Sequence, residues 1–300
     1  MHPLTTPLRY PGGKGQLANF IKLLIRMNGL QDGHYAEVYA GGAAVAFSLL
    51  FEDWVTRVFI NDIDPAIYSF WSSVIGAPED LCRAIIDTPV NMQQWKRQKA
   101  IHSDPHNHDP HRLAFATFFL NRTNRSGILK GGVIGGKAQD GRWRLDARYN
   151  KRDLVDRIQR IARRGDRISV SNLDAADFLT TIVPTLNQKA LVFLDPPYYR
   201  KGEGLYEHHY SHVDHVKISK LLSKSVHRPW VVSYDDVPEI RSLYSSFKSQ
   251  QYSLSYSAQE RYKGAEIMFF CHGLVVPPAE SPLRISSNDL TMALESLYAS

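Results

Sequence analysis

The chain has 300 residues, a net charge of +6 and 43% hydrophobic residues, which suits one large domain or one domain with a smaller insert. Its two cysteines, Cys82 and Cys271, exclude a disulfide framework and favour a reduced, intracellular, cytoplasmic setting. The first residues do not have the pattern of a signal peptide, and no window approaches 18 apolar residues, so neither secretion nor a membrane span is expected.

The first 77 residues carry the pattern of a nucleotide-binding unit. The elements expected there are, in chain order, a Pro/Gly loop at 7–15, a helix at 16–27, a strand at 35–40, a helix at 43–51, a strand at 58–62 and a helix at 65–76. Gly41-Gly42 follows the first strand, and Asn61-Asp62 ends the second. Strand, glycine turn, helix, strand and acid in this order are typical of a βαβ unit that binds a nucleotide. Neither a third glycine nor a Walker-type motif is present, so a ligand with a zwitterionic tail is favoured over a polyphosphate.

Residues 78–167 differ in character from the segments on either side. They predict helices over 78–120 with a polar loop at 102–111, then a loop or short hairpin at 121–150 and a basic amphipathic helix at 151–164. Between residues 122 and 167 the chain has 14 Lys or Arg against 5 Asp, a local net charge of +9, which leaves about −3 for the rest. This asymmetry indicates a surface for a polyanion; a solvated helix face rich in arginine is the alternative.

The last part of the chain returns to strands. They are expected at 167–172, 190–195, 230–235 and 267–276, and a Pro/Ser-containing segment with a short helix follows at 277–300. The strand at 190–195 is apolar up to its final Asp, which is typical of a strand buried on both faces of a sheet. These strands and the first unit together predict an α/β fold.

The strongest chemical signal is Asp195-Pro196-Pro197-Tyr198, at the end of the apolar strand. Open α/β sheets bind ligands at the carboxyl ends of their strands. The two prolines stiffen the turn and fix the directions of its carbonyl groups. An exocyclic amine carries two protons, which the Asp195 carboxylate and the Pro196 carbonyl can accept, and Tyr198 offers a ring on which a base can stack. An ordinary Pro-Pro exit from a strand is the alternative.

The glycine turn Glu37-Val38-Tyr39-Ala40-Gly41-Gly42 is the second signal. Its two glycines allow the backbone to approach a ligand closely. Asp62 follows about 20 residues later at a strand end, where nucleotide-binding units place an acid that holds a ribose diol. For an isolated Asp, capping the next helix is the alternative.

In their order along the chain, these motifs resemble the Dam-like, D12 class of N6-adenine-specific DNA methyltransferases. The residues that carry the resemblance are Tyr10-Pro11-Gly12-Gly13-Lys14, Glu37 to Gly42, Asn61-Asp62, Asp177-Phe178 and Asp195 to Tyr198. The resemblance implies a Rossmann-like methyltransferase fold with an inserted DNA-recognition subdomain, S-adenosylmethionine as cofactor and double-stranded DNA as partner. We therefore expect a catalytic domain at 1–77 and 168–276, a helical, basic recognition insert at 78–167 and a C-terminal tail at 277–300.

The resemblance also implies roles for individual residues. The implied cofactor contacts are Tyr10, Gly13 and Lys14 near the methionine moiety, Glu37, Gly41 and Gly42 along the pocket, Asp62 at the ribose, and Asp177 and Phe178 at the adenine. Asp174 is a rival for the adenine contact, because the same short stretch contains both acids. Asp195, Pro196, Pro197 and Tyr198 take the flipped target adenine.

The recognition region departs from the pattern of the family. Many relatives carry Asn-Arg-Thr-x-x-x-Gly-x-x-Arg-x-Asn, whereas this chain has Lys130 where the guanine-reading arginine stands. Lysine contacts a guanine without the fixed guanidinium fork, so the familiar GATC target is in question. The residues expected to contact DNA are Arg122, Asn124, Arg125 and Lys130. Trp143 is either a base-stacking residue or part of the core of the insert.

No metal is expected, because the histidine-rich stretches at 102–111 and 208–215 fit no zinc spacing. Two other functions stay open. One is methylation of cytosine N4 or of an RNA base, although Asp at the start of the Pro-Pro-Tyr motif favours adenine. The other is a catalytically silent DNA-binding relative that keeps the fold. The sequence predicts no particular protein partner.

Overall fold

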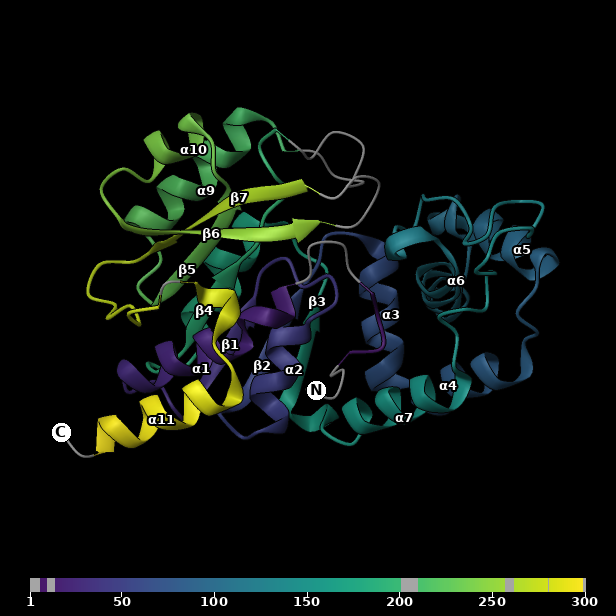
Figure 1. Ribbon diagram of the computed structural model, residues 1–300, viewed down its shortest axis with the longest axis horizontal. Helices are drawn as coiled ribbons and strands as arrows, with labels where there is room; N and C mark the ends of the chain where they lie inside the picture. The colour runs from purple at the N-terminus through teal and green to yellow at the C-terminus, as the bar shows by residue number, and fades with distance from the viewer. Residues whose placement is uncertain (1–5, 10–13, 201–209, 257–261, 280, 299–300) are drawn as a thin grey trace.

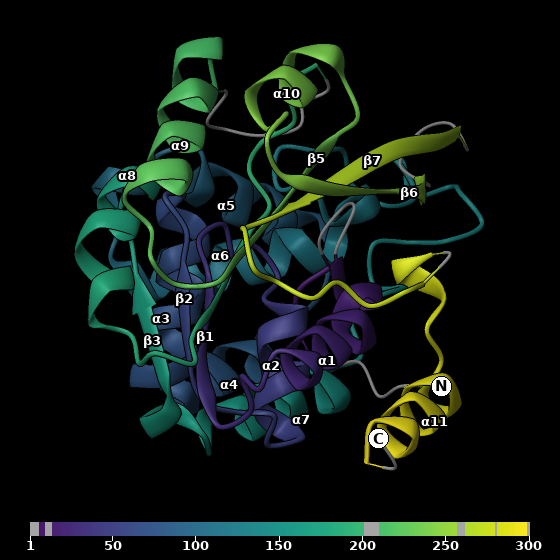
Figure 2. The same ribbon diagram turned by 90° about the vertical axis from the view of Figure 1, so that its left-hand side faces the viewer.

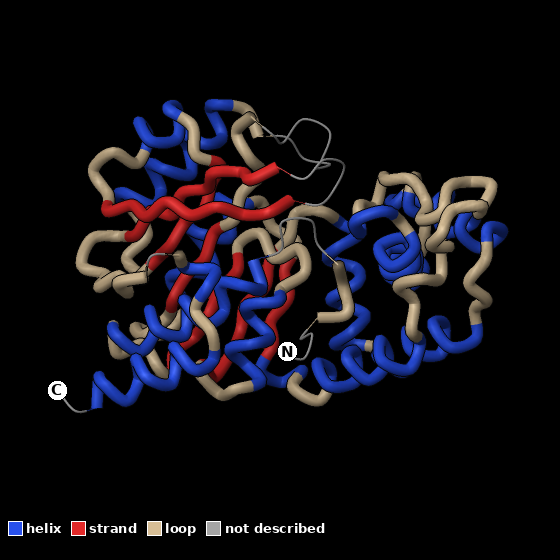
Figure 3. Tube along the Cα trace, in the orientation of Figure 1, coloured by secondary structure: helices blue, strands red, loops and turns tan. Residues whose placement is uncertain are grey.

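The computed structural model describes residues 6–9, 14–200, 210–256, 262–279 and 281–298. Its centre is a seven-stranded sheet with the order β3-β2-β1-β4-β5-β7-β6. The strands are β1 (Gly33–Glu37), β2 (Val55–Asn61), β3 (Ile168–Ser171), β4 (Leu191–Leu194), β5 (Trp230–Asp235), β6 (Lys248–Tyr256) and β7 (Tyr262–Phe270). Strands β1 to β5 are parallel, and β7 lies antiparallel between β5 and β6 (Figure 3).

Helices cover both faces of this sheet (Figure 1). One face carries α1 (Ala18–Met27), α2 (Ala44–Phe51) and α3 (Pro65–Gly76), and the other carries α8 (Ala175–Asp177), α9 (His212–Lys224) and α10 (Pro238–Leu243). Along β4, Leu191 and Phe193 belong to the first core, whereas Val192 and Leu194 belong to the second. Because both faces of β4 are covered, all four of its residues are apolar and buried.

The order of the strands reverses between β1 and β4. From β1 the chain moves outward to β2 and β3, and it then returns to place β4 on the other side of β1. In open α/β sheets, ligands bind outside the carboxyl ends of the strands at such a reversal. Glu37, the last residue of β1, and Asp195, the first after β4, both lie there.

A helical lobe lies beside the sheet (Figures 1 and 3). It contains α4 (Pro78–Asp87), α5 (Met92–His102), α6 (Pro110–Thr123) and α7 (Lys151–Ala162). Aromatic packing joins it to the α/β part, since the rings of Phe70 on α3 and Phe118 on α6 stack with centroids 6.0 Å apart. At the other end of the chain, α11 (Ser287–Tyr298) packs beside α1 (Figure 2).

Short helical turns complete the description. They are η1 (Lys14–Leu17), η2 (Pro105–Asn107), η3 (Arg125–Gly127), η4 (Gly165–Arg167), η5 (Phe178–Ile182), η6 (Val183–Thr185) and η7 (Pro282–Arg284). Of these, η1 places Lys14 at the start of the chain's first helical segment, next to the carboxyl edge of the sheet described below.

The Rossmann-like α/β fold expected from the sequence is confirmed. The helix at 65–76 and the strand at 230–235 have the predicted bounds, and the other predicted strands of the parallel part differ by a few residues at their ends. The prediction for the last strand was wrong in its bounds, because β7 begins at Tyr262 and ends at Phe270. Strand β6 was missed: it forms the edge of the sheet and is polar, and Tyr252 is its single buried residue among positions 248–253.

Candidate active site

Asp195 stands at the reversal point of the sheet, directly after β4. Its side chain is 25% exposed, and its Oδ1 forms an ion pair with the Lys14 ammonium at 3.2 Å. Pro196 is buried and Pro197 is half-buried behind it. One carboxylate oxygen is thus held by Lys14, while the partial exposure leaves Asp195 reachable by a ligand.

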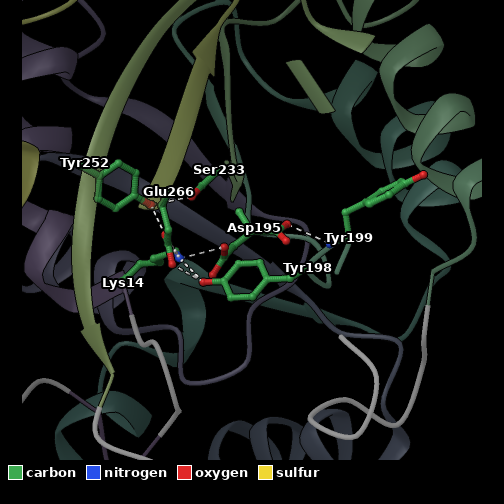
Figure 4. A network of polar contacts seen from close by, with 8 residues as sticks. Lys14, Asp195, Tyr198, Tyr199, Ser233, Tyr252 and Glu266 are labelled. Atoms are coloured by element: carbon green, nitrogen blue, oxygen red, sulfur yellow. Dashed lines mark hydrogen bonds and ion pairs between the residues drawn. The ribbon is translucent and has the colours of Figure 1, made fainter. Parts of the chain in front are cut away.

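Lys14 brings together residues that are distant in the sequence (Figure 4). Its buried ammonium donates to the Tyr198 hydroxyl at 2.9 Å and to Glu266 Oε2 at 2.7 Å, in addition to the ion pair with Asp195. The Tyr198 hydroxyl in turn donates to Glu266 Oε1 at 2.5 Å. The N-terminal motif, the Asp-Pro-Pro-Tyr motif and the antiparallel strand β7 therefore meet in one polar network.

The charges in this network shift one another's pKa values. Burial raises the pKa of Asp195 to about 6; Lys14 opposes the rise and Glu266 adds to it. Burial lowers the pKa of Lys14, but the two carboxylates outweigh it and raise the pKa overall. At neutral pH the network therefore holds a lysine ammonium and an Asp195 that is mostly ionised and able to accept a hydrogen bond.

The segment after Pro197 is hydrogen-bonded to the end of the neighbouring strand β5. Asp235, at the end of β5, accepts the backbone N–H of Tyr199 at 2.9 Å and that of Arg200 at 3.1 Å. Tyr198 is 4% exposed, with its hydroxyl tied to Glu266 as described above. Tyr198 therefore offers little of its ring to a stacking base in this structure.

The glycine turn lies at the other side of the reversal point. Gly41 has a φ of +45°, a conformation that favours glycine, and its N–H donates to Asp62 Oδ2 at 2.9 Å. Its carbonyl accepts the indole N–H of Trp71 at 2.9 Å. Gly42 follows in the same turn, just before α2. Glu37 Oε1 accepts the N–H of Ala46 in the first turn of α2 at 3.0 Å. The predicted pocket residues are thus linked through backbone groups.

Two carboxylates at this turn have raised pKa values. Burial raises the pKa of Glu37 to about 8 and that of Asp62 to about 7, and Asp64 adds to the second shift. Among the described residues, neither Glu37 nor Asp62 forms an ion pair. Carboxylates of this kind suit a ligand that carries an ammonium group and hydroxyls, which S-adenosylmethionine does.

The two residues expected at the cofactor adenine lie in different environments. Phe178 is 1% exposed and belongs to the core under α9, whereas Asp177 is exposed. The rival Asp174 caps α8 through the N–H of Ala176, and the Asn172 amide, two residues before it, donates to the Asp62 carbonyl at 2.7 Å. Asp174 is therefore the acid of this pair that is closer along the chain to the contact with Asp62.

Part of the N-terminal motif lies outside the described residues. Tyr10 and Gly13 fall there, and their predicted contacts are not addressed by the structure. The segment just before them is held in place by the insert. The Asn121 side chain accepts the N–H of Arg9 at 2.7 Å and donates to the carbonyls of Arg9 and Gly127, at 2.6 and 3.0 Å.

Two of the four residues expected to contact DNA are buried. Arg122 is 8% exposed and donates to the carbonyls of Arg148 and Pro7, at 2.8 and 3.3 Å. Asn124 is fully buried, accepts the indole N–H of Trp95 at 2.7 Å and donates to the carbonyls of Ile128 and Leu129. Asn124 thus binds the backbone of the predicted recognition loop (residues 125–134), whereas Arg122 binds the backbone at Arg148 and Pro7.

The other two candidates lie on the surface of the same loop. Arg125 and Lys130 are both exposed. Further along, Trp143 is 62% exposed and packs against the Arg142 guanidinium, 5.4 Å from its ring centroid. Of the two roles considered for Trp143, a place in the core of the insert is therefore excluded. Leu145 and Tyr149, both 6% exposed, take that place instead.

The described residues also show what the histidine-rich stretches do. His111 Nδ1 lies 3.1 Å from the Ser73 hydroxyl, and His215 packs against Tyr199, Tyr210 and Tyr234. Nowhere in the described ranges do three or more His, Cys, Asp or Glu residues gather as metal ligands would. Among those same residues, no helix is long and apolar enough to cross a lipid bilayer.

Glu266, Tyr252 and Asp235 were missed by reasoning from the sequence. Asp235 carries a signal, because it ends an apolar strand as Asp195 does. Glu266 and Tyr252 have no such signal: they lie inside antiparallel strands and face each other across the β6–β7 pairing. Their importance follows from the position of β7, which brings Glu266 next to Lys14.

Comparison with solved structures yields distant similarities. A protein from Pyrococcus horikoshii, described as a candidate RNA methyltransferase, is 8% identical with a TM-score of 0.43, over 88% of this chain and 85% of that one. The rRNA methyltransferase AviRa from Streptomyces viridochromogenes is 14% identical with a TM-score of 0.39, over 87% of this chain and 86% of that one. Both TM-scores are below 0.5, so the fold assignment rests on the strand order and not on these similarities.

Comparison with known sequences is more informative. No curated protein matches the chain. The model of the family described as D12 class N6 adenine-specific DNA methyltransferase matches residues 10–257, which includes every motif from the N-terminal lysine to the Asp-Pro-Pro-Tyr turn. The structure places Lys14, the Gly41-Gly42 turn, Asp62 and the Asp195–Tyr198 turn at the carboxyl edge of the sheet. The chain therefore belongs to the D12 class of N6 adenine-specific DNA methyltransferases.

Proposed function

We propose that this methyltransferase transfers the methyl group of S-adenosylmethionine, the cofactor of its family, to N6 of an adenine flipped out of double-stranded DNA. One observation carries the proposal. Asp195 stands at the reversal point of the sheet with one carboxylate oxygen held by Lys14 and a quarter of its side chain accessible. The proposal extends the family membership to a particular nucleic acid and to a particular route by which the base enters.

The chemistry required of the protein is mainly orientation. The N6 amine of adenine carries two protons, and the Asp195 carboxylate and the Pro196 carbonyl accept one each. When both protons are held on the side of Asp195, the nitrogen lone pair is free to attack the methyl group from the opposite side. The cofactor carries the methyl group on a sulfonium, so the bond from N6 to the methyl carbon forms as the carbon–sulfur bond breaks, and S-adenosylhomocysteine leaves as a neutral thioether. One of the two N6 protons is then released to solvent. Alignment and electrostatics then account for most of the acceleration.

The proposed cofactor contacts are made mainly by the carboxylates at the glycine turn. Glu37 is placed to bind the ammonium of the methionine moiety, and the Gly41-Gly42 turn allows close approach of the chain. Asp62 binds the ribose hydroxyls. For the cofactor adenine we propose Asp174 in place of Asp177, because the chain just before Asp174 contacts Asp62 through the Asn172 amide. Phe178 then supports this site from the core, and Tyr10 and Gly13 keep the contacts implied by the family.

DNA is proposed to bind across the recognition loop. Arg125 and Lys130 are exposed there, and Asn124 holds the backbone between them through the carbonyls of Ile128 and Leu129. Trp143 is an exposed aromatic ring next to Arg142, a combination that suits stacking on a base and contact with a phosphate. The lobe at 78–167 is thus the proposed recognition insert of a catalytic domain formed by 1–77 and 168–276, with 277–300 as a tail.

Transfer of a labelled methyl group tests the proposal. The full chain is incubated with tritiated S-adenosylmethionine and, separately, with duplex DNA free of adenine methylation, with single-stranded DNA of the same sequence and with RNA. We expect label in the duplex DNA and little in the RNA. Label confined to RNA would overturn the choice of nucleic acid. No transfer to any of them, with cofactor binding intact, would instead indicate a silent DNA-binding relative.

A further inference from the structure

Glu266 is a buried carboxylate at the active site that no sequence motif identifies. It lies on β7 with 1% of its surface exposed. Its carboxylate accepts hydrogen bonds from the Lys14 ammonium at 2.7 Å, the Tyr198 hydroxyl at 2.5 Å and the Tyr252 hydroxyl at 2.6 Å. Tyr252 lies within 2.6 Å of the Ser233 hydroxyl, so the chain of polar contacts continues to β5 (Figure 4). A charge buried this deeply is retained only when its partners satisfy it.

Glu266 is linked to both Tyr198 and Asp195 of the Asp-Pro-Pro-Tyr turn. It binds Tyr198 directly through the hydroxyl, and it binds the same ammonium that forms the ion pair with Asp195. Lys14 therefore carries one positive charge between two carboxylates. If Glu266 were neutral, that charge would act on Asp195 alone.

We infer that Glu266 is a positioning residue for methyl transfer: it fixes the Tyr198 ring through its hydroxyl and shares Lys14 with Asp195, which keeps Asp195 a strong hydrogen-bond acceptor for the amine. The inference rests on the proposed role of Asp195. It adds a residue that need not touch the substrate, cofactor or reacting atoms.

The charge of Glu266 and its shape have separable effects. The titratable groups around Asp195 are Lys14, Tyr35, Glu37, Tyr198, Tyr252 and Glu266. Among them, Lys14 lowers the pKa of Asp195 and Glu266 raises it, on top of the effect of burial. Removing only the charge of Glu266 should thus lower the pKa of Asp195, whereas a purely structural role would leave it in place.

The first test titrates Asp195 without any substrate. The full chain is labelled with ¹³C at the aspartate carboxyls, and the Asp195 signal is assigned by its loss in Asp195→Asn. In Glu266→Gln, which keeps the shape, we expect the titration midpoint of Asp195 to fall by about one pH unit. Tyr252→Phe is the matched control: it removes a neutral donor from the same carboxylate, and the midpoint should stay near that of the wild type.

The second test uses the reaction itself. The pH dependence of kcat is measured on unmethylated duplex DNA at saturating S-adenosylmethionine, where the acid limb reports the ionisation of Asp195 in the complex. We expect this limb to move to lower pH in Glu266→Gln and to higher pH in Lys14→Met. Absence of methyl transfer by the wild type would contradict the proposed function, while the titration in the free protein would still decide the role of Glu266.

An unchanged Asp195 midpoint in folded Glu266→Gln would overturn the inference. If Glu266→Gln does not fold, because Lys14 is left with less compensation, the double variant Lys14→Met/Glu266→Gln removes both charges. Its Asp195 midpoint should lie below that of Lys14→Met alone. Equal midpoints in these two proteins would also overturn the inference, since Glu266 would then have no electrostatic effect on Asp195.

Discussion

The carboxylates on the two sides of the candidate active site have different partners. On the side of β4 and β7, Asp195 and Glu266 share the Lys14 ammonium, and the pKa of Asp195 is held near 6. On the side of the glycine turn, Glu37 and Asp62 are bonded to backbone N–H groups, and their pKa values rise to about 8 and 7. The charge of Asp195 is therefore compensated by Lys14, whereas the side of the glycine turn favours a ligand that brings positive charge and hydroxyls.

The largest expected effect is the loss of methyl transfer when Asp195, on the side compensated by Lys14, is replaced. Asp195→Asn keeps the size of the side chain but replaces the charged acceptor, so we expect methyl transfer to fall by about 100- to 10,000-fold. Affinity for S-adenosylmethionine should stay close to that of the wild type, because its proposed contacts lie on the other side. Single-turnover kinetics and calorimetry measure the two quantities. A variant with near-normal turnover would show that Asp195 does not orient the amine.

The uncompensated side should show the opposite behaviour. Asp62→Ala is expected to weaken binding of S-adenosylmethionine by roughly 1–3 kcal/mol, because the ribose hydroxyls lose a charged acceptor. Binding of DNA should change little. Asp64→Ala is the matched control, since Asp64 caps α3 through the N–H of Ala66 and has no proposed ligand contact. If calorimetry finds the loss in Asp64→Ala and not in Asp62→Ala, the ribose site has to be moved to Asp64.

A third effect should be confined to one base position of the DNA. If Arg125 or Lys130 reads a guanine beside the target adenine, replacing that residue by Ala should cost about 1–3 kcal/mol on the preferred site and flatten the preference at one position. Arg160 on α7 serves for comparison, since its guanidinium packs over the Phe51 ring. Its replacement should weaken all sequences alike or none. The base preference of each variant is measured by methylation of a library with randomised sites. If both loop variants keep the wild-type preference, the residues that read the base lie elsewhere, for example near Arg142–Arg148.

The smallest effect is on stability. A carboxyl whose pKa is raised by folding, as that of Glu37 is to about 8, contributes stability that is complete at low pH and lost as the pH rises through that value. We therefore expect cofactor-free Glu37→Gln to be more stable than the wild type at pH 9, by about 1 kcal/mol or more, and much less so at pH 5. Thermal unfolding measures this, with exposed Glu79→Gln as control. If the two proteins differ in stability by the same amount at pH 9 and at pH 5, ionisation of Glu37 does not destabilise the fold.

Sequence patterns predicted the parts of the molecule that depend on local order along the chain. The glycine turn, Asp62 and the Asp-Pro-Pro-Tyr turn were found because each lies at the end of a predicted strand. The recognition loop shows the limit of this reasoning. Arg122 and Asn124 are polar residues in a basic segment, yet they are buried and donate hydrogen bonds to backbone carbonyls of the protein. Composition does not distinguish such a residue from an exposed one like Arg125.

Tertiary pairing accounts for the rest of what was missed. Strand β6 has few apolar residues because it is an edge strand, and Glu266 reaches Lys14 only through the antiparallel insertion of β7 between β5 and β6. The two residues are 252 positions apart in the chain. No local sequence pattern indicates such a contact, whereas the order of the strands in the sheet explains it.

The identity of the methylated atom tests the central claim most directly. Unmethylated duplex DNA is treated with the full chain and S-adenosylmethionine carrying a ¹³C methyl group, digested to nucleosides and analysed by mass spectrometry against authentic standards. The account predicts labelled N6-methyldeoxyadenosine with the wild type and at most a trace with Asp195→Asn. Labelled N4-methyldeoxycytidine in its place, or equal product from the Asp195→Asn variant, would contradict it.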